Sequence, residues 1–217
     1  MVLAMPEPVK RHYRSAVRDA QALDTRARIR QAASELFIAQ GYAATTIRQV
    51  ARRSGVGERT IYDAFSSKAA LFGHVLDTAV GGDEADLTVA ERADVLDAIG
   101  DPDPVSAVER YVDHGVDLLE RAGDLIMVSI EAAGSDPDMR ATADAGAEAT
   151  HRLHLELTRA LAERGGLRPG VDPESAADII YGLISPHLHQ LLRRHRGWSS
   201  DRYRTWLRRS VIDQILA

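Results

Sequence analysis

The sequence contains no cysteine among its 217 residues. Disulfide bonds and thiolate metal sites are therefore excluded, and cysteine usage does not indicate a redox compartment. No apolar run approaches the ~18 residues that a membrane-spanning helix needs, and the N-terminus has no apolar signal-peptide core. These absences predict a cytoplasmic protein that does not bind or cross a membrane.

Motifs of common enzyme classes are also missing. The sequence has no nucleophile elbow, no phosphate-binding glycine loop, no zinc-binding helix motif and no close pair of acid and base groups. We therefore expect a protein that is not an enzyme and that uses no cofactor. An all-helical enzyme and a helical adaptor that binds proteins through an acidic body are the alternatives from other functional classes.

The composition is that of an ordinary globular protein, with 45% hydrophobic and 27% charged residues. Apolar residues recur at helical spacing and no strand-like alternation occurs, which predicts an all-α fold. The net charge of −5 is unevenly distributed, because residues 1–80 hold 12 basic and 7 acidic side chains. Residues 81–217 hold 15 basic and 25 acidic side chains. A basic segment joined to an acidic body indicates a protein that meets DNA at one end.

Residues 45–68 have the pattern of a helix-turn-helix. Thr45 or Thr46 can cap a first helix, whose apolar residues fall on one face. Gly55 can adopt the positive φ that a short turn needs. A second helix over residues 58–65 keeps its polar residues on the outer face, as a helix that enters the DNA major groove does.

This stretch and its flanks resemble the N-terminal domain of the TetR family of bacterial transcription regulators. The spacing of the matching residues fits the family pattern without an insertion or a deletion. These residues are Ala32, Ala33, Leu36, Phe37, Gly41, Tyr42, Thr45, Thr46, Ile47, Val50, Ala51, Ser54, Gly55, Val56, Thr60, Ile61, Tyr62, Phe65, Lys68, Leu71 and Phe72. The resemblance implies a homodimeric repressor that binds palindromic double-stranded operator DNA and is released by a small-molecule effector. A ligand-responsive activator of the same fold is the alternative reading.

Three segments follow from these patterns. We expect a flexible basic arm over residues 1–23, with some helix near its end, and a helix-turn-helix domain over 24–80. Within that domain the first helix opens at Asp24 or Thr25, and the helix-turn-helix itself covers about 46–65. An effector-binding and dimerisation domain, built as a helical bundle, then covers 81–217.

Three Asp-Pro pairs predict helix starts in the second domain, because aspartate caps a helix and proline suits its first position. The expected body helices are 104–122, 123–133, 137–164, 173–196 and 200–216, with a shorter one near 91–99. Pro186 should kink the fourth of these. The last two helices, about 173–216, are apolar on more than one side, which predicts that they form the homodimer interface.

The candidate DNA contacts separate by chemistry. Thr46, Tyr62 and Lys68 are the phosphate contacts that the resemblance implies, while Arg48, Arg59 and Thr60 are candidates for base edges. Two carboxylates depart from the common family pattern. For Glu58 we expect a base-reading or helix-stabilising role, and for Asp63 an ion pair with a nearby arginine.

The effector contacts are sought among polar groups on apolar body helices. The candidates are Tyr111, His114, Met127, Glu131, His151, His154 and Tyr181. His151 and His154 could bind a metal together with His114. The lack of cysteine and of a convergent carboxylate pattern argues against this, so we predict no metal site.

Overall fold

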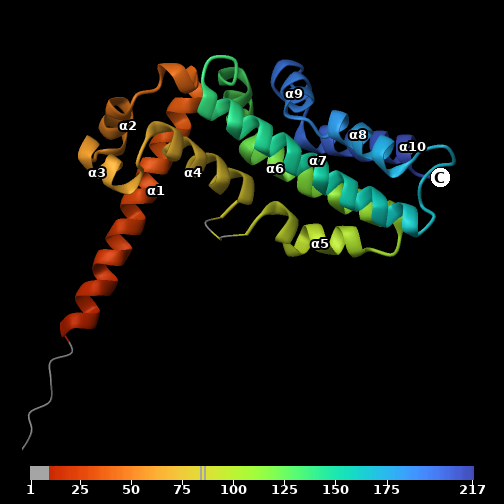
Figure 1. The fold of residues 1–217 in the computed structure, drawn as a ribbon, viewed down its shortest axis with the longest axis horizontal. Coiled ribbons are helices and arrows are strands. Elements are labelled where there is room, and N and C mark those ends of the chain that lie inside the picture. Colours follow the sequence, from red (N-terminus) through yellow and green to blue (C-terminus); the bar gives the residue numbers. More distant parts are fainter. Residues whose placement is uncertain (1–9, 84, 86) are drawn as a thin grey trace, which may run out of the picture. The chain divides into compact units, whose positions relative to one another are not determined.

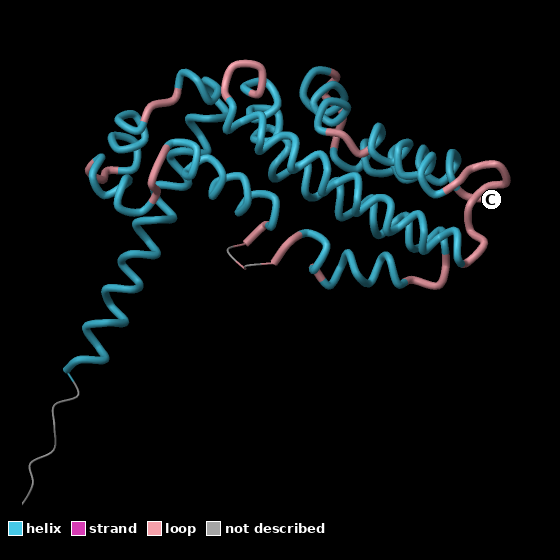
Figure 2. Tube along the Cα trace, in the orientation of Figure 1, coloured by secondary structure: helices cyan, strands magenta, loops and turns pink. Residues whose placement is uncertain are grey.

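The computed structural model describes residues 10–83, 85 and 87–217. Helices are the regular elements of this part of the chain, apart from one isolated antiparallel bridge between Leu167 and Leu216 (Figure 2). The all-α prediction is therefore confirmed. The chain forms two compact units that divide between Val75 and Leu76, inside α4 (Lys68–Gly81, Figure 1). The expected boundary after residue 80 falls near the end of the same helix.

The first unit contains α1 (Lys10–Ala44), α2 (Ile47–Ser54), α3 (Glu58–Ala64) and the first part of α4. Its core joins α1 to α4 through the rings of Phe37 and Phe72, which meet edge to face with centroids 5.0 Å apart. Tyr42 completes this group, 5.6 Å from Phe72. Offset and edge-to-face ring pairs stabilise a core beyond their buried area.

The first helix begins earlier than the sequence predicted. α1 starts at Lys10, so part of the expected arm is helical, and residues 1–9 lie outside the described residues. Thr25 does not cap the helix: its hydroxyl donates to the carbonyl of Gln21, 2.8 Å away and one turn earlier, as a threonine inside a helix does. The predicted stop at Gly41 is confirmed, because this residue leaves helical geometry with φ 77°. The bounds of α1 reach Ala44 because they include a short helical turn after this kink.

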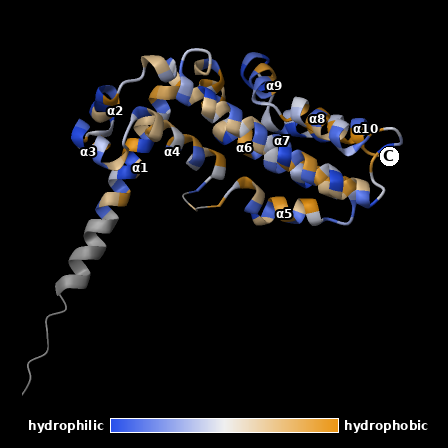
Figure 3. Ribbon diagram, viewed as in Figure 1, coloured by the Kyte–Doolittle hydropathy of each residue, from blue (hydrophilic) through white to orange (hydrophobic). Residues whose placement is uncertain are grey.

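The second unit is organised around α6 (Pro104–Ala132), which contacts α5 (Ala93–Gly100), α7 (Pro137–Glu163) and α10 (Ser200–Ile215). Between α7 and α10 the chain forms α8 (Pro173–Leu183), α9 (Pro186–His189) and a π-helical turn, η2 (Gln190–His195). A short 3-10 turn, η1 (Val89–Glu91), precedes α5. Figure 3 shows polar and apolar residues mixed along each of these helices, as expected where one face is buried.

Aspartate caps begin three of these helices, as predicted. The carboxylate of Asp103 accepts from the backbone N–H of Ser106 at 2.9 Å, and Asp136 and Asp172 cap α7 and α8 in the same way. Proline follows each cap at the start of the helix. This local chemistry needs no tertiary partner, so the sequence alone locates it.

Two expected helices have different limits. The predicted break at residue 123 is wrong, because α6 runs through Gly123, where an added Cβ would lie 3.3 Å from Nδ1 of the buried His189. The predicted helix over 173–196 is divided instead of kinked. Pro186 starts α9 after a Ser185 cap, because a residue before proline avoids helical geometry.

Gly115 should be required for the close approach of Ile184, the residue that follows α8, to α6. An added Cβ would lie 2.8 Å from Cγ2 of Ile184, which is buried. Gly115→Ala should therefore lower the free energy of unfolding by about 1–3 kcal/mol, despite the better helix propensity of alanine. Urea unfolding measures this change. Gly146→Ala on α7 is the control, because nothing lies within 4 Å of that Cβ, and it should stabilise the protein by up to about 1 kcal/mol.

Candidate nucleic-acid interface and ligand-sensing site

The helix-turn-helix is built by local contacts. Thr46 caps α2: its hydroxyl accepts from the N–H of Gln49 at 3.3 Å, while the Gln49 side chain accepts from the N–H of Thr46 at 2.8 Å. Gly55 ends α2 with φ 71°, and its N–H bonds to the carbonyl of Ala51. The predicted cap and the predicted left-handed glycine are both confirmed. This reciprocal capping box fixes where α2 begins.

α3 buries one face and exposes the other. Ile61 is fully buried and Phe65 is 8% exposed, as predicted. The predicted base-reading residues Arg59 and Thr60 are exposed on α3, and Tyr62 is half exposed. Arg48 is exposed on α2. Arg48, Arg59, Thr60 and Tyr62 thus lie outside the core and are available to a partner.

The two acidic residues of α3 have different surroundings. Asp63 Oδ2 lies 3.9 Å from Arg59 Nε, one helical turn away, which confirms the predicted ion pair. Both side chains are largely exposed, so water and salt weaken their attraction. Glu58 is the first residue of α3, where a carboxylate complements the helix dipole.

Lys68 turns toward its own unit. Its ammonium donates to the carbonyls of Tyr42 at 3.0 Å and Thr45 at 3.2 Å, and it lies 4.0 Å from the centre of the Tyr42 ring. It therefore ties the start of α4 to the corner between α1 and α2. A phosphate contact by Lys68, which the resemblance implies, would have to draw the ammonium away from these carbonyls.

Four of the predicted effector contacts meet in the body. Tyr111 on α6 and His154 on α7 share a buried hydrogen bond of 2.7 Å between the hydroxyl and Nδ1. The ring of Tyr181 on α8 lies 6.2 Å from that of His154 and 6.1 Å from that of His151. His151 Nε2 lies 3.0 Å from Oδ1 of Asp178. We call Tyr111, His151, His154 and Tyr181 the aromatic group.

Burial shifts the pKa values of two members of the aromatic group, His154 and Tyr111. Removal from water lowers the pKa of His154 to about 3, with a smaller contribution from the neighbouring His151, so its ring is neutral near pH 7. Burial also raises the pKa of the Tyr111 hydroxyl. His154 Nε2 is buried without a hydrogen-bond partner among the described residues. An unsatisfied buried nitrogen is costly, which makes it a natural point for a polar contact.

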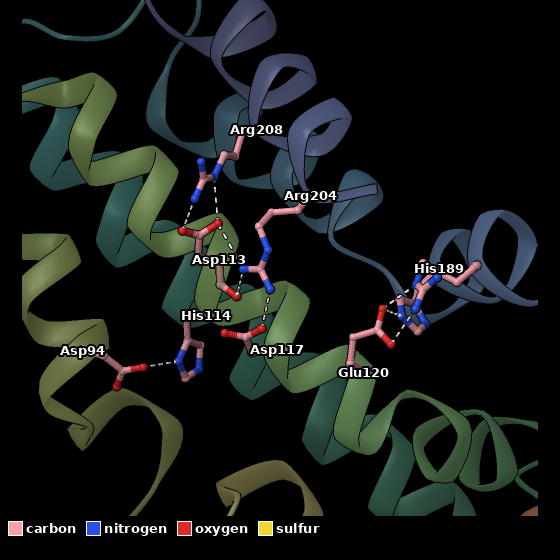
Figure 4. Close-up of polar contacts among 9 residues, drawn as sticks. Asp94, Asp113, His114, Asp117, Glu120, His189, Arg204 and Arg208 are labelled. Carbon is pink, nitrogen blue, oxygen red and sulfur yellow. Dashed lines mark hydrogen bonds and ion pairs between the residues drawn. The ribbon is translucent and has the colours of Figure 1, made fainter. Parts of the chain in front are cut away.

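The other three predicted effector contacts lie elsewhere. His114 faces α5, where Nδ1 lies 2.6 Å from Oδ2 of Asp94 (Figure 4). Met127 is buried and Glu131 is exposed in the last turns of α6. The three histidines considered for a metal thus have separate partners. In the described part of the chain, no three histidine or carboxylate side chains are grouped so that they could hold a metal ion.

Sequence reasoning missed a row of ion pairs on α6. Asp113, Asp117, Glu120 and Asp124 recur at spacings of four and three, and they pair with arginines that follow in the C-terminal helices. Figure 4 shows Asp113 and Asp117 beside the guanidinium group of Arg204. The bond from Arg193 is the main reason that the pKa of Glu120 falls to about 2. The regular spacing of the acidic residues on α6 can be read from the sequence. Their arginine partners lie about 70 to 95 residues later, so the sequence does not show the pairing.

Comparison with known proteins decides the family. Residues 29–75 match the family described as "Bacterial regulatory proteins, tetR family". The HTH-type transcriptional regulator TtgW of Pseudomonas putida, itself uncharacterized, is 34% identical over 107 residues, which cover 45% of this chain and 80% of that protein. The chain belongs to the TetR family. The family assignment favours a DNA-binding regulator over the enzyme and adaptor alternatives.

Two further comparisons extend the similarity over most of the chain. The uncharacterized regulator YdeS of Bacillus subtilis is 29% identical over 161 residues, covering 72% of this chain and 74% of that protein. The crystal structure of NalD, a repressor of a multidrug efflux pump in Pseudomonas aeruginosa, aligns with a TM-score of 0.68. It is 23% identical and covers 91% of this chain and 98% of that one, so it shows the shared fold.

The buried His154 should make this TetR-family protein less stable as the pH falls. Its pKa is about 3 in the folded protein against 6.5 for the unfolded chain, so the unfolded chain binds more protons between these values. Stability should therefore be complete above pH 6.5 and should fall by up to about 1.4 kcal/mol per pH unit as the pH drops toward 3.

Unfolding in urea between pH 6.5 and 4.5 tests this effect. His154→Gln removes the titrating group, so its stability should depend less on pH than that of the wild type. His195→Gln, at an exposed histidine, is the control and should retain the wild-type slope. Equal slopes for all three proteins would contradict the assignment of a buried neutral His154.

Proposed function

We propose that the chain is a cytoplasmic homodimeric repressor that binds palindromic operator DNA and is released from it by a small molecule. The observation that carries the DNA part is the exposed polar face of the helix-turn-helix, with Arg59, Thr60 and Tyr62 on α3 and Arg48 on α2. Their core-facing neighbours are buried, so this face is presented by a rigid support. A short helix of this kind fits the major groove of duplex DNA.

Roles on this face follow from side-chain chemistry. Arg48 and Arg59 carry planar guanidinium groups that can bind O6 and N7 of guanine together. The hydroxyls of Thr46 and Tyr62 suit phosphate oxygens, although the Thr46 hydroxyl also donates to Gln49 Oε1 at 2.9 Å. Thr60 can contact either a base or a phosphate. No helix in the described part of the chain is long and apolar enough to cross a membrane.

The dimer proposal rests on apolar groups that the single chain leaves uncovered. Leu191 of η2 is 52% exposed and Tyr181 of α8 is 39% exposed. Trp198, Trp206 and Ile212 are only partly buried where they pack on the core. All of these residues lie within 173–216, the segment that the sequence predicted as the interface. A second copy that covers them would bring two DNA-reading faces together, as a palindrome requires.

The effector proposal rests on the aromatic group and on fold-level similarity. A solved structure of the same fold, 17% identical with a TM-score of 0.65, is a complex of SmeT with triclosan. The aromatic group offers a buried hydroxyl, an unsatisfied imidazole nitrogen and ring faces in one place. Apolar pockets with a few placed polar groups are the usual form of small-molecule sites.

DNA binding tests the proposed function directly. Fluorescence anisotropy with the DNA upstream of the coding region should show binding that is tighter than to a scrambled duplex of equal length. Deletion of the gene should raise expression from that promoter, whereas an activator would give lower expression. A protein that does not distinguish the two duplexes at low ionic strength would contradict the proposal.

Arginine 48 should contribute to sequence recognition. Arg48→Ala should weaken operator binding by about 1–3 kcal/mol and binding to random DNA by less, because it removes a base contact. Tyr62→Phe should weaken both alike, because a phosphate contact carries no sequence information. Arg152→Ala is the control in the same anisotropy assay: it removes an exposed, paired arginine from α7. Equal losses for Arg48→Ala on both duplexes would contradict base reading.

Leucine 191 should lie in the dimer interface. Leu191→Glu places a charge on a side chain that is half exposed in the single chain, so the subunit should fold while the dimer weakens. Sedimentation velocity should then show a monomer at concentrations where the wild type is dimeric. Leu96→Glu on α5 is the matched control, because Leu96 is 54% exposed. A wild-type monomer, or equal effects of the two variants, would contradict this interface.

A further inference from the structure

A polar pocket of about 240 Å³ lies beside the C-terminal end of α4, within the second unit. Gly81 and Gly82 form one wall. Its side chains come from the segment after α4, from α5 and its cap, and from α6: Asp83, Arg92, Asp94, His114, Asp117 and Arg121. Of the predicted effector contacts, only His114 lines this pocket, so it is separate from the aromatic group.

Two nitrogen atoms in the pocket residues lack a partner. The side chain of His114 is only 9% exposed, and its Nε2 has no hydrogen bond to the described residues. Nε of Arg92 is likewise buried without a partner in that part of the chain. Such atoms are rare in folded proteins unless a ligand or water satisfies them. They are the observation that points to a bound polar molecule.

Among the described lining residues, one guanidinium has no carboxylate as an ion-pair partner. Arg92 binds Asp83 through two bonds of 2.9 and 3.0 Å, and this pairing lowers the pKa of Asp83 to about 2. Asp94 pairs with His114, and Asp117 pairs with Arg204 (Figure 4). Arg121 forms no ion pair with the described residues. Arg121 is therefore the lining cation that an anionic group can approach, although three carboxylates also line the pocket.

Arg121 instead holds the end of α4. Its Nε and Nη2 donate to the carbonyls of Ala79 at 3.4 Å and Val80 at 3.3 Å, which belong to the last turn of that helix. These bonds are long, so they are weak. The side chain lies against Gly82, where an added Cβ would be 3.2 Å from Arg121 Nε. An anion in the pocket would compete with the two carbonyls for the same guanidinium.

His114 selects a second group on the ligand. Because Nδ1 faces the carboxylate of Asp94, it carries a proton, and Nε2 is the ring atom left to form a hydrogen bond with a ligand. Burial alone would raise the pKa of Asp94, but the bond to His114 and its charge hold that pKa below the ordinary value. His114 and Arg121 are two turns apart on α6, a rise of about 10 Å. The ligand group that bonds to His114 and the anionic group that binds Arg121 should therefore sit at opposite ends of the ligand.

We propose that this pocket binds a small organic carboxylate that carries a hydroxyl at its far end. The carboxylate binds Arg121 and Nε of Arg92, and the hydroxyl forms a hydrogen bond with Nε2 of His114. Binding releases Arg121 from the carbonyls of α4, so the ligand acts on the helix that leads to the DNA-reading unit. This last step rests on the proposed function, whereas binding itself does not.

Isothermal titration of the purified full-length protein tests the site. The probes are 4-hydroxybenzoate, benzoate and 4-hydroxybenzamide, whose rigid ring keeps the two polar groups apart. Saturable binding of 4-hydroxybenzoate is expected, with affinity lower by about tenfold or more for the neutral amide, because it loses charge-assisted bonds. Benzoate should bind with an intermediate affinity. Absent or non-saturable binding of 4-hydroxybenzoate, or equal affinity for the amide, would overturn the proposal.

Variants locate the binding to the pocket. Arg121→Met should reduce the affinity for 4-hydroxybenzoate by about tenfold or more. Arg159→Met is the matched control, because Arg159 forms an exposed ion pair with Glu174 elsewhere in the body, and it should stay within about twofold. Circular dichroism verifies that both variants fold. Equal affinities for Arg121→Met and the wild type would place the ligand elsewhere and overturn the site.

Anisotropy with operator DNA separates this proposal from the proposed function. If 4-hydroxybenzoate binds and releases the wild type from DNA but not Arg121→Met, the site and its coupling are both supported. If it binds with the expected variant pattern but DNA affinity is unchanged, the site is supported and the coupling to α4 is overturned. Failure of the protein to bind any DNA would contradict the proposed function and leave the titration result to decide the site.

Discussion

The second unit depends on α6, a single helix that packs apolar residues on one side and forms ion pairs with other helices on another. Its apolar stripe includes Val108, Val112 and Val116, which are fully buried. Its acidic side carries Asp113, Asp117 and Glu120, which bind arginines of η2 and α10. Each exposed pair alone contributes about 0–1 kcal/mol, but linked and partly buried pairs are more sensitive to the loss of one member. α6 therefore orients the C-terminal helices as well as burying them.

The buried His189 shows how closely this side of α6 is packed. Its ring stacks edge to face on Tyr203 with centroids 5.4 Å apart, and Nε2 lies 3.4 Å from Oε1 of Glu120. Burial lowers the pKa of His189 even though Glu120 favours its charged form. Gly123 makes room for this ring on α6. The close approach explains why a glycine in the middle of a long helix is tolerated despite its poor propensity.

The predictions from sequence that proved accurate mostly concern residues that act on their immediate neighbours. Asp103, Asp136 and Asp172 cap helices within three residues, and Thr46 and Gly55 set the ends of α2 through contacts of the same range. Two of the errors involve contacts that are distant in the sequence. Gly123 does not end a helix but lies inside α6 against His189, which is far along the chain. Lys68 turns inward to carbonyls that lie more than twenty residues earlier. No local pattern encodes such contacts.

The candidate site was predictable to the same degree. Exposure of Arg59, Thr60 and Tyr62 follows from the period of α3, because burying Ile61 and Phe65 leaves them on the other side. The aromatic group required three helices to meet, and only its residue types were visible beforehand. The pocket beside α4 was less visible, since Arg92 and Arg121 carry no pattern that distinguishes them from surface arginines.

A ligand can control DNA binding only if its affinity differs between two states of the protein. Arg121 provides a physical basis for such a difference in the body. Its guanidinium can bind either the last carbonyls of α4 or an anion in the pocket, and weak bonds of 3.3 and 3.4 Å make the first choice easy to reverse. α4 continues without a break from Lys68 to Gly81, across the division between the two units. A change in how its last turn is held is therefore a change in the covalent link between sensing and DNA reading.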